Sequence, residues 1–270
     1  MSYAIHEVST ETGEPVELYT FLYTGKAWYL TNATQAVRYD NRDFVPTQVR
    51  RGELNIGSDS TKATCDIELP FDSEIASLFI VQPPSEVVSV TILCAHISDT
   101  ILDPVVIWKG RVVQSNWKGV ICTLNTENVF SSLERPGVTR KYSRQCTHTL
   151  YSKACGVDIK KHEFDVTVTG LEGSKISLNN PKPGQMGGGI LRYKNSITGA
   201  IERRPITADA AGFILVNISA IGLNVGDTAT LVMGCPHTME ACDTIFANTP
   251  NYGGQPYVPA LNPFGNSSLW

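Results

Sequence analysis

The chain has 270 residues and a formal net charge of −4, with 42% hydrophobic and 18% charged residues. This length suits one large domain or two to three modest ones, and the composition is that of a folded protein rather than a disordered one. The acidic balance excludes broad binding to nucleic acid or to anionic membranes as the main task.

The N-terminal stretch, MSYAIHEVSTETGEP, has no basic segment leading into an apolar one, so we expect no secretory signal. No uninterrupted apolar run approaches the roughly 20 residues that cross a bilayer, and we expect no membrane insertion by this chain. A soluble protein made in the cytoplasm follows from these two features. Its seven cysteines are then expected to be reduced thiols or metal ligands rather than a disulfide scaffold.

Residues 1–135 predict a β-rich domain, because runs of Val, Ile, Thr, Tyr and Trp alternate with turn signals. The pattern is typical of an antiparallel sandwich or barrel. One helix is expected within residues 72–80, where Asp72 or Ser73 can cap it. The predicted strands lie within residues 15–23, 26–32, 63–70, 86–97, 104–117 and 119–129.

Three cysteines fall inside these predicted strands, at Cys65, Cys94 and Cys122. A free cysteine behaves as a small buried hydrophobe, and we expect that role for all three.

After a linker at residues 136–162, residues 163–232 predict a second β domain, a small barrel or sandwich. A hairpin is expected around Thr198-Gly199. The triple glycine at residues 187–189 is not followed by Gly-Lys-Ser/Thr, so it predicts a loop feeding a strand rather than a phosphate loop. We expect Arg203 and Arg204, like Arg50 and Arg51 of the first domain, on solvated strand or turn faces.

Residues 233–270 predict a different kind of structure. The part from Phe246 to Trp270 is rich in Pro, Gly, Asn and aromatic residues, which indicates an irregular, extended segment. So many aromatic residues need a surface to lie on, either in this chain or in a neighbouring subunit. Overall, the sequence predicts a mainly β protein with two barrel- or sandwich-like domains and an extended C-terminal segment.

One short cysteine motif, here called a cysteine phrase, occurs twice in the sequence. The first copy, QCTHTLYSKAC, lies in the linker, and the second, GCPHTMEAC, follows the second β domain. Both contain Cys-x-His-Thr and both end with Ala-Cys. The cysteines of the first phrase are Cys146 and Cys155, and those of the second are Cys235 and Cys242. The phrases flank the second β domain, so convergence of the four thiols would tie its two ends together.

The spacings make different demands on the two phrases. Cys235 and Cys242 are seven residues apart, close to two helical turns, so a helix beginning at Pro236 would place both on one face. Cys146 and Cys155 are nine residues apart, which an unbroken helix would put on opposite sides. The chain must therefore turn between them, and Gly156 permits such a turn.

Four thiols at one point favour metal, and soft thiolates suit both zinc and iron–sulfur clusters. The tight Cys-x2-4-Cys pairs of zinc ribbons are absent from this sequence. Iron–sulfur clusters tolerate wider spacings. From spacing alone, two disulfides and four separately packed cysteines stay open as alternatives. We interpret His148 and His237 as hydrogen-bonding residues beside the cysteines rather than as ligands.

The phrases, their spacings and the C-terminal F-x-N-x-x-N-Y-G-G-x-P-Y-V-P-x-x-N-P-F (Phe246 to Phe264) together resemble a tail-tip family of long-tailed phages and gene transfer agents. That family includes baseplate hub proteins and is similar to the minor tail protein L of phage lambda. The segment from Gly156 to Gly234 is longer here than in lambda's protein. The resemblance implies that Cys146, Cys155, Cys235 and Cys242 ligate a [4Fe–4S] cluster, with zinc as the alternative metal.

The resemblance also implies a structural role in the virion at the tail tip, after assembly in the host cytoplasm. Such a hub connects the ring of distal tail protein at the tube end to a central fibre or spike, as a homotrimer. Non-specific contact with DNA in the tail lumen is an expectation of the same kind.

Two other functions compete with a structural hub. An iron–sulfur redox protein or electron carrier is the main alternative, but the sequence has no dinucleotide fingerprint or flavin-type glycine-rich turn. A cysteine hydrolase is a third reading, and Cys146 with His148 is too local to form a catalytic dyad. We therefore expect no enzyme activity.

Overall fold

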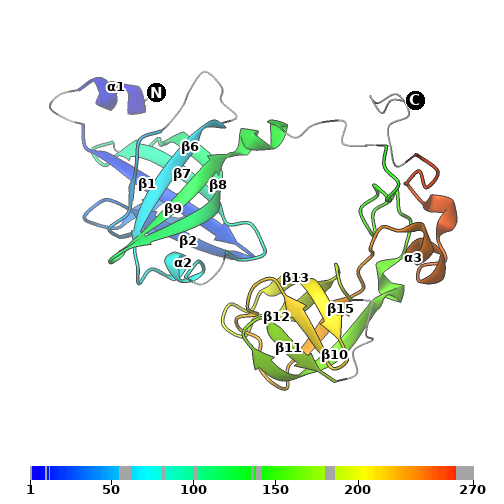
Figure 1. Ribbon diagram of the computed structural model, residues 1–270. Helices are drawn as coiled ribbons and strands as arrows, with labels where there is room; N and C mark the ends of the chain where they lie inside the picture. The colour runs from blue at the N-terminus through cyan, green and yellow to red at the C-terminus, as the bar shows by residue number, and fades with distance from the viewer. Residues whose placement is uncertain are drawn as a thin grey trace, which may run out of the picture. The chain divides into compact units, whose positions relative to one another are not determined.

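The computed structural model describes residues 2–9, 11, 13–54, 62–80, 83–99, 102–134, 137, 142–179 and 186–259. The chain divides into two compact units, residues 1–136 and 137–270. Strands dominate both units and helices are few and short, so the predicted mainly β fold is confirmed (Figure 1).

The first unit contains a nine-stranded sheet in the order β3-β4-β2-β1-β7-β8-β9-β6-β5. Neighbours pair antiparallel except β2 and β4, which pair parallel. The strands are β1 (Pro15–Tyr23), β2 (Lys26–Thr31), β3 (Val37–Tyr39), β4 (Arg42–Pro46), β5 (Arg50–Arg51), β6 (Thr64–Pro70), β7 (Ser89–His96), β8 (Val105–Lys118) and β9 (Ile121–Asn128).

Strand β1 is buried on both of its faces. Leu18 points to one face and Tyr19 and Phe21 to the other, and none of the three is exposed to solvent. Leu18 packs in a cluster with Phe44 of β4 and Ala95 of β7. Because the centre of the sheet has apolar contacts on both sides, β1 carries large apolar or aromatic side chains on both of its faces.

The predicted helix of this unit is confirmed as α2 (Glu74–Ser77). Ser73 is its N-cap, with the side-chain oxygen accepting a 3.1 Å hydrogen bond from the amide of Ala76. Ile75 is buried on the helix, and Phe79 is buried just beyond it. The unit also contains α1 (Ser2–Val8) and the 3-10 helix η2 (Val129–Glu134), neither of which the sequence pattern predicts.

The second unit contains a closed six-stranded barrel, with the circular order β10-β11-β14-β13-β12-β15. Its core holds alternate side chains of every strand, such as Val166, Ile176, Leu191, Ile214 and Leu231. The strands are β10 (Glu163–Glu172), β11 (Lys175–Leu178), β12 (Ile190–Lys194), β13 (Ile201–Ala210), β14 (Phe213–Val216) and β15 (Thr228–Val232).

Two predictions about the barrel have different outcomes. The hairpin around Thr198-Gly199 is confirmed, since β12 and β13 pair antiparallel up to Lys194 and Ile201. The expectation that Arg204 is solvated is wrong. Its side chain is only 8% exposed and lies 3.1 Å from the carboxylate of Glu202, which is 3% exposed. The alternation of β13 points both side chains inward.

Outside the barrel, the second unit has one α-helix and two 3-10 helices among its described residues. These are η3 (Ile159–Lys161), α3 (Met239–Thr244) and η4 (Thr249–Asn251). The irregular C-terminal segment predicted from Phe246 onward contains η4 and otherwise no regular structure as far as Pro259. Residues 260–270 of that segment lie outside the described residues.

Candidate metal centre

The closed barrel brings the two cysteine phrases to the same place. Its first strand, β10, and its last, β15, are antiparallel neighbours, and Glu163 lies opposite Val232. The amide of Met233 also donates a 3.0 Å hydrogen bond to the carbonyl of His162. The segment that enters the barrel and the segment that leaves it therefore start side by side.

Glycines set the path of the chain as it leaves the barrel. A Cβ atom on Gly234 would lie 2.0 Å from the carbonyl oxygen of Gly187, and one on Gly189 would lie 2.1 Å from that of Val232. The triple glycine thus packs directly against the residue before Cys235 and leads into β12 at Ile190. The predicted loop feeding a strand is confirmed, and close backbone approach is its physical reason.

The first phrase reverses direction between its cysteines, as the spacing predicts. Tyr151 and Gly156 have positive φ values, 63° and 73°, and the amide of Gly156 donates to the carbonyl of Ser152 at 2.9 Å. The amide of Cys155 donates to the Ser152 hydroxyl at 3.3 Å. The turn at the end of the phrase is confirmed.

The second phrase differs from the prediction of a helix beginning at Pro236. Thr238 is the N-cap of α3, its hydroxyl accepting a 3.2 Å hydrogen bond from the amide of Ala241. His237 has a φ of 60°, which no α-helical residue adopts. Cys235 therefore lies before the helix and Cys242 within it, and the bend at His237 replaces a shared helical face.

The four cysteines nevertheless line one small cavity. Around it lie both histidines of the phrases and residues of α3 and of the segment that follows: Cys146, His148, Leu150, Cys155, Val157, Cys235, His237, Thr238, Cys242, Phe246, Asn248 and Asn251. All four cysteines are free thiols. Among the described residues, no group of three or more His, Cys, Asp or Glu side chains is arranged to hold a single metal ion.

The thiols perturb one another electrostatically. Burial raises the pKa of Cys235, and the nearby Cys146 and Cys155 raise it further, while the amide of His237 acts in the opposite direction. The pKa of Cys242 is raised by burial and then by the other three thiols. Four thiolates crowded in this way repel one another, so charge at this site requires a compensating cation.

Three N–H groups point at the sulfur atoms. The amides of Gly253 and His237 donate to Cys146 Sγ and Cys235 Sγ, each at 3.3 Å, and Asn248 Nδ2 lies 3.9 Å from Cys155 Sγ. Hydrogen bonds of this kind stabilise thiolate ligands and tune the groups that they bind.

The two histidines lie at the cavity wall in different ways. His148 Nδ1 is 3.1 Å from the carbonyl oxygen of Asn251, and its ring packs on Gly253. His237 acts through its backbone, whose carbonyl accepts from the amide of Cys146 at 2.9 Å and from the hydroxyl of Tyr252 at 3.2 Å. Their role beside the cysteines stays a prediction.

Residues after α3 complete the site, and reasoning from cysteine spacing alone misses them. Asn248, Asn251, Tyr252 and Gly253 contact the phrases, and all four belong to the F-x-N-x-x-N-Y-G-G stretch. That stretch is the signal that could have found them. Its later positions, from residue 260 to Phe264, lie outside the described residues.

The other three cysteines lie in the first unit. Cys65 and Cys122 are buried, as predicted, and burial raises the pKa of each thiol to about 11. Cys94 is partly exposed, so the expectation of burial is wrong for this cysteine. None of the three lines the cavity of the four-cysteine site.

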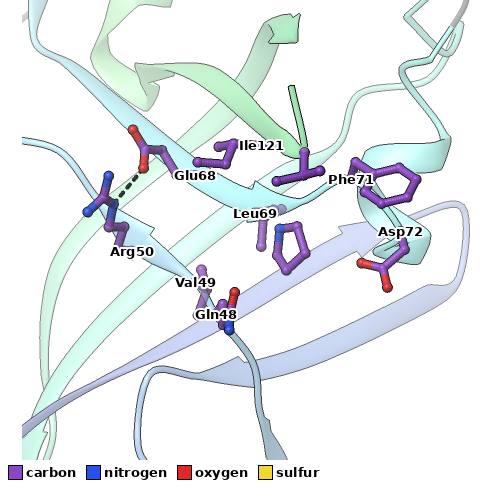
Figure 2. Close-up of a pocket in the computed structure, with 10 residues that line it drawn as sticks. Gln48, Val49, Arg50, Glu68, Leu69, Phe71, Asp72 and Ile121 are labelled. Carbon is purple, nitrogen blue, oxygen red and sulfur yellow. Dashed lines mark hydrogen bonds and ion pairs between the residues drawn. The ribbon is translucent and has the colours of Figure 1, made fainter. Parts of the chain in front are cut away.

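A groove of about 710 Å³ lies on the first unit, and the sequence does not predict it. It runs between Gln48 and Val49, which precede β5, and the ends of β6 and β9. Figure 2 shows the ion pair of Arg50 and Glu68, 2.5 Å apart, on one side of it and Phe71 on the other. Phe71 is about half exposed, so the groove combines apolar and charged groups.

Comparisons with known proteins match two different parts of the chain. A family described as baseplate hub protein, N-terminal attachment domain, matches residues 17–158, and one described as phage conserved hypothetical protein BR0599 matches residues 184–262. The first match includes Cys146 and Cys155, and the second includes Cys235 and Cys242. A search of curated proteins returned no match.

A similar fold occurs in a solved structure entitled "Virion of native gene transfer agent (GTA) particle". One of its chains superposes with a TM-score of 0.76 at 18% sequence identity, covering 96% of this chain and 93% of that chain. Within the described residues no helix is long and apolar enough to cross a membrane. Since the baseplate hub profile matches more than half of its length, the chain belongs to the baseplate hub protein family of phages and is a structural protein of the virion tail.

Proposed function

We propose that Cys146, Cys155, Cys235 and Cys242 bind a [4Fe–4S] cluster that stabilises this hub protein. The observation that carries the proposal is the convergence of four free thiols, from two distant stretches of chain, on one cavity. The N–H donors at Cys146 and Cys235 add support, because they favour the thiolate form that a cluster requires.

A cluster fits the donor set better than zinc does. The cysteines are nine and seven residues apart within the two phrases, unlike the tight pairs of zinc ribbons. A cluster takes one thiolate at each of its corners and tolerates such wide spacings.

The cluster's contribution is structural in this proposal. When bound, it supplies iron–sulfur bonds that cross-link the chain before the barrel to the chain after it. Because the first phrase contains turns and little regular structure, binding free energy becomes folding free energy there. The chain's own residues hold the thiols, donate to sulfur and cover the site.

Anaerobic purification followed by iron and sulfide analysis tests the proposal. Wild-type protein is expected to contain iron and acid-labile sulfide and to absorb in the visible range, whereas Cys242→Ser is expected to lose the iron and to melt earlier in the second unit. Cys94→Ser, in the first unit, is the matched control and should keep the iron. Wild-type protein that contains neither iron nor sulfide would refute the cluster, and zinc in its place would support the alternative metal.

An iron–sulfur redox protein is the alternative function. This function requires reversible electron transfer to a partner. Two results together would favour it: electron-transfer turnover by the cluster-containing protein, and normal tail assembly by protein without the cluster. We expect the opposite pattern, with assembly lost and no turnover. The same preparation is expected to show no hydrolytic activity on cell-wall material.

We also propose that the hub is a homotrimer whose first unit attaches to the ring of distal tail protein, and which carries the central fibre. The description of the matched family as an attachment domain, covering most of the first unit, supports the attachment by that unit. Phe71→Ser in the groove is expected to weaken binding to purified distal tail protein. Val225→Ser, at another exposed apolar position in the second unit, is the control, and equal binding by both variants would contradict the groove's part in attachment.

We further propose that the hub makes non-specific contact with DNA in the tail lumen. The net charge of −4 predicts weak binding that disappears as salt concentration rises. Filter binding of labelled duplex DNA at low and at physiological salt checks it.

A further inference from the structure

We propose that residues 248–258, here called the C-terminal clasp, hold the first cysteine phrase in position, and that Asn248 and Gly253 are the positioning residues. The inference rests on the proposed cluster, but it concerns residues that hold the cysteines rather than the ligands themselves. Its physical basis is the set of contacts that the clasp makes at both ends of the first phrase, with residues 143–148 and with Cys155.

The clasp is hydrogen-bonded to the first phrase and to the two residues that precede it. One of the bonds below joins backbone to backbone, and each of the others joins a side chain to a backbone carbonyl. They join Gln255 N to Ser143 O at 2.7 Å, Arg144 Nε to Val258 O at 2.6 Å, Tyr252 Oη to Arg144 O at 2.7 Å, Thr147 Oγ1 to Gly253 O at 3.3 Å and His148 Nδ1 to Asn251 O at 3.1 Å.

Asn248 joins one cysteine of each phrase. Its amide N–H donates to the carbonyl of Cys242 at 2.9 Å, and its side-chain Nδ2 donates to the carbonyl of Cys155 at 2.6 Å. Asn251 Nδ2 donates to Asn248 Oδ1 at 2.8 Å, which fixes the orientation of the Asn248 amide. One residue, through its backbone and its side chain, thereby links the backbones of two of the four cysteines.

Gly253 holds a third cysteine at close range. Its amide donates to Cys146 Sγ at 3.3 Å. A Cβ atom at this position would lie 2.6–2.7 Å from ring atoms of His148. Gly253 has no positive φ, so the requirement for glycine comes from lack of space beside the imidazole and not from backbone conformation.

This distinction between space and conformation gives a sharp test. In Gly253→Ala the methyl group collides with the His148 ring, so the clasp should lift from Cys146. Chelator-driven iron loss is then expected to be about tenfold faster or more, the effect typical of residues that support metal ligands. Adding Gly253→Ala to His148→Ala should cause little further loss, because the colliding ring is gone.

Two neighbouring variants serve as comparisons. A Cβ on Gly254 would lie 2.6 Å from the backbone oxygen of Arg144, so the effect of Gly254→Ala should persist in the His148→Ala background. Gly137 has nothing within 4 Å, and Gly137→Ala is the neutral control. Asn248→Asp keeps the size of the side chain but removes its N–H donors, and it should also speed iron loss, whereas Asn217→Asp on the barrel should not.

The outcomes separate the clasp from the cluster. Equal rates of iron loss in wild-type, Gly253→Ala and Asn248→Asp proteins would overturn the clasp while leaving the cluster in place. If wild-type protein contains no iron, the cluster fails, and hydrogen exchange of residues 143–155 decides about the clasp. Faster exchange there in Gly253→Ala, reversed in the His148→Ala background, supports it, and unchanged exchange overturns it.

Discussion

The backbone N–H of Cys146 donates a 2.9 Å hydrogen bond to the backbone carbonyl of His237. This bond joins the two Cys-x-His-Thr phrases main chain to main chain, from the first position of one phrase to the third position of the other. It needs the bend at His237, because the positive φ of that residue turns its carbonyl away from the path of a helix.

The bend at His237 predicts an unusual order of substitutions. His237→Gly should have about the same free energy of unfolding as wild type. Glycine relieves the left-handed backbone strain but adds entropy to the unfolded chain, and the two effects, each about 1 kcal/mol, oppose each other. His237→Val should lose about 1–3 kcal/mol, since a β-branched residue resists this conformation. Urea unfolding of both variants checks the order, and equal losses would contradict it. Iron content should persist in His237→Gly if His237 is not a ligand.

The glycine contacts below Cys235 predict a strong contrast between neighbours. Gly189→Ala should destabilise the second unit by about 3 kcal/mol or more, or prevent its folding, because the added Cβ meets the backbone of Val232. Gly187→Ala should cost less than about 1 kcal/mol, since its Cβ approaches only a side-chain oxygen of Asp209, at 3.3 Å. Thermal unfolding with a probe in the barrel measures both, and similar melting temperatures for the two variants would argue against the packing described here.

The ion pair of Glu202 and Arg204 inside the barrel predicts strong coupling. Glu202→Gln should cost about 3–5 kcal/mol, because Arg204 keeps its buried charge without the carboxylate beside it. Replacing both residues, as in Glu202→Leu with Arg204→Met, should be nearly neutral because no charge is then buried. A double-mutant cycle in urea measures the coupling. Additive losses would contradict it.

The buried cysteines of the first unit predict slow, pH-dependent alkylation. With a pKa of about 11, Cys65 and Cys122 are about one part in a thousand thiolate at pH 8. Since a raised pKa keeps the thiol protonated, the rate should rise about tenfold per pH unit towards pH 11 while the protein stays folded. Mass spectrometry after iodoacetamide treatment reads this directly, with urea-unfolded protein as the reference. Labelling of Cys122 at the unfolded rate would disprove its protection.

Local pattern predicts the long strands well and the short ones poorly. Alternation and turn residues identify β1 and β8, because the apolar residues that these strands bury are present in their own local sequence. The two residues of β5 carry no such pattern, and they form a strand because β6 pairs with them. Arg51 likewise looks solvated in sequence, yet it lies 2.7 Å from Glu17 across the sheet and is only 29% exposed. Contacts between distant residues decide both cases.

The site shows the same division. The repeated cysteine motif identifies all four cysteines that line the cavity, because the repeat is visible in the sequence itself. The helix start is mispredicted because Pro236 suits a first helical position, whereas Thr238 two residues later provides the cap. The part played by Asn248 depends on the carbonyl of Cys155, 93 residues earlier, which no local pattern reveals.

The pairing of Glu163 with Val232 has a consequence for how such proteins diversify. Because the chain enters and leaves the barrel at neighbouring strands, the number of strands between them is free to change. Strands added to the barrel, or removed from it, would leave both cysteine-bearing arms where they are. A larger or smaller barrel could therefore stand in this place without moving the four cysteines apart.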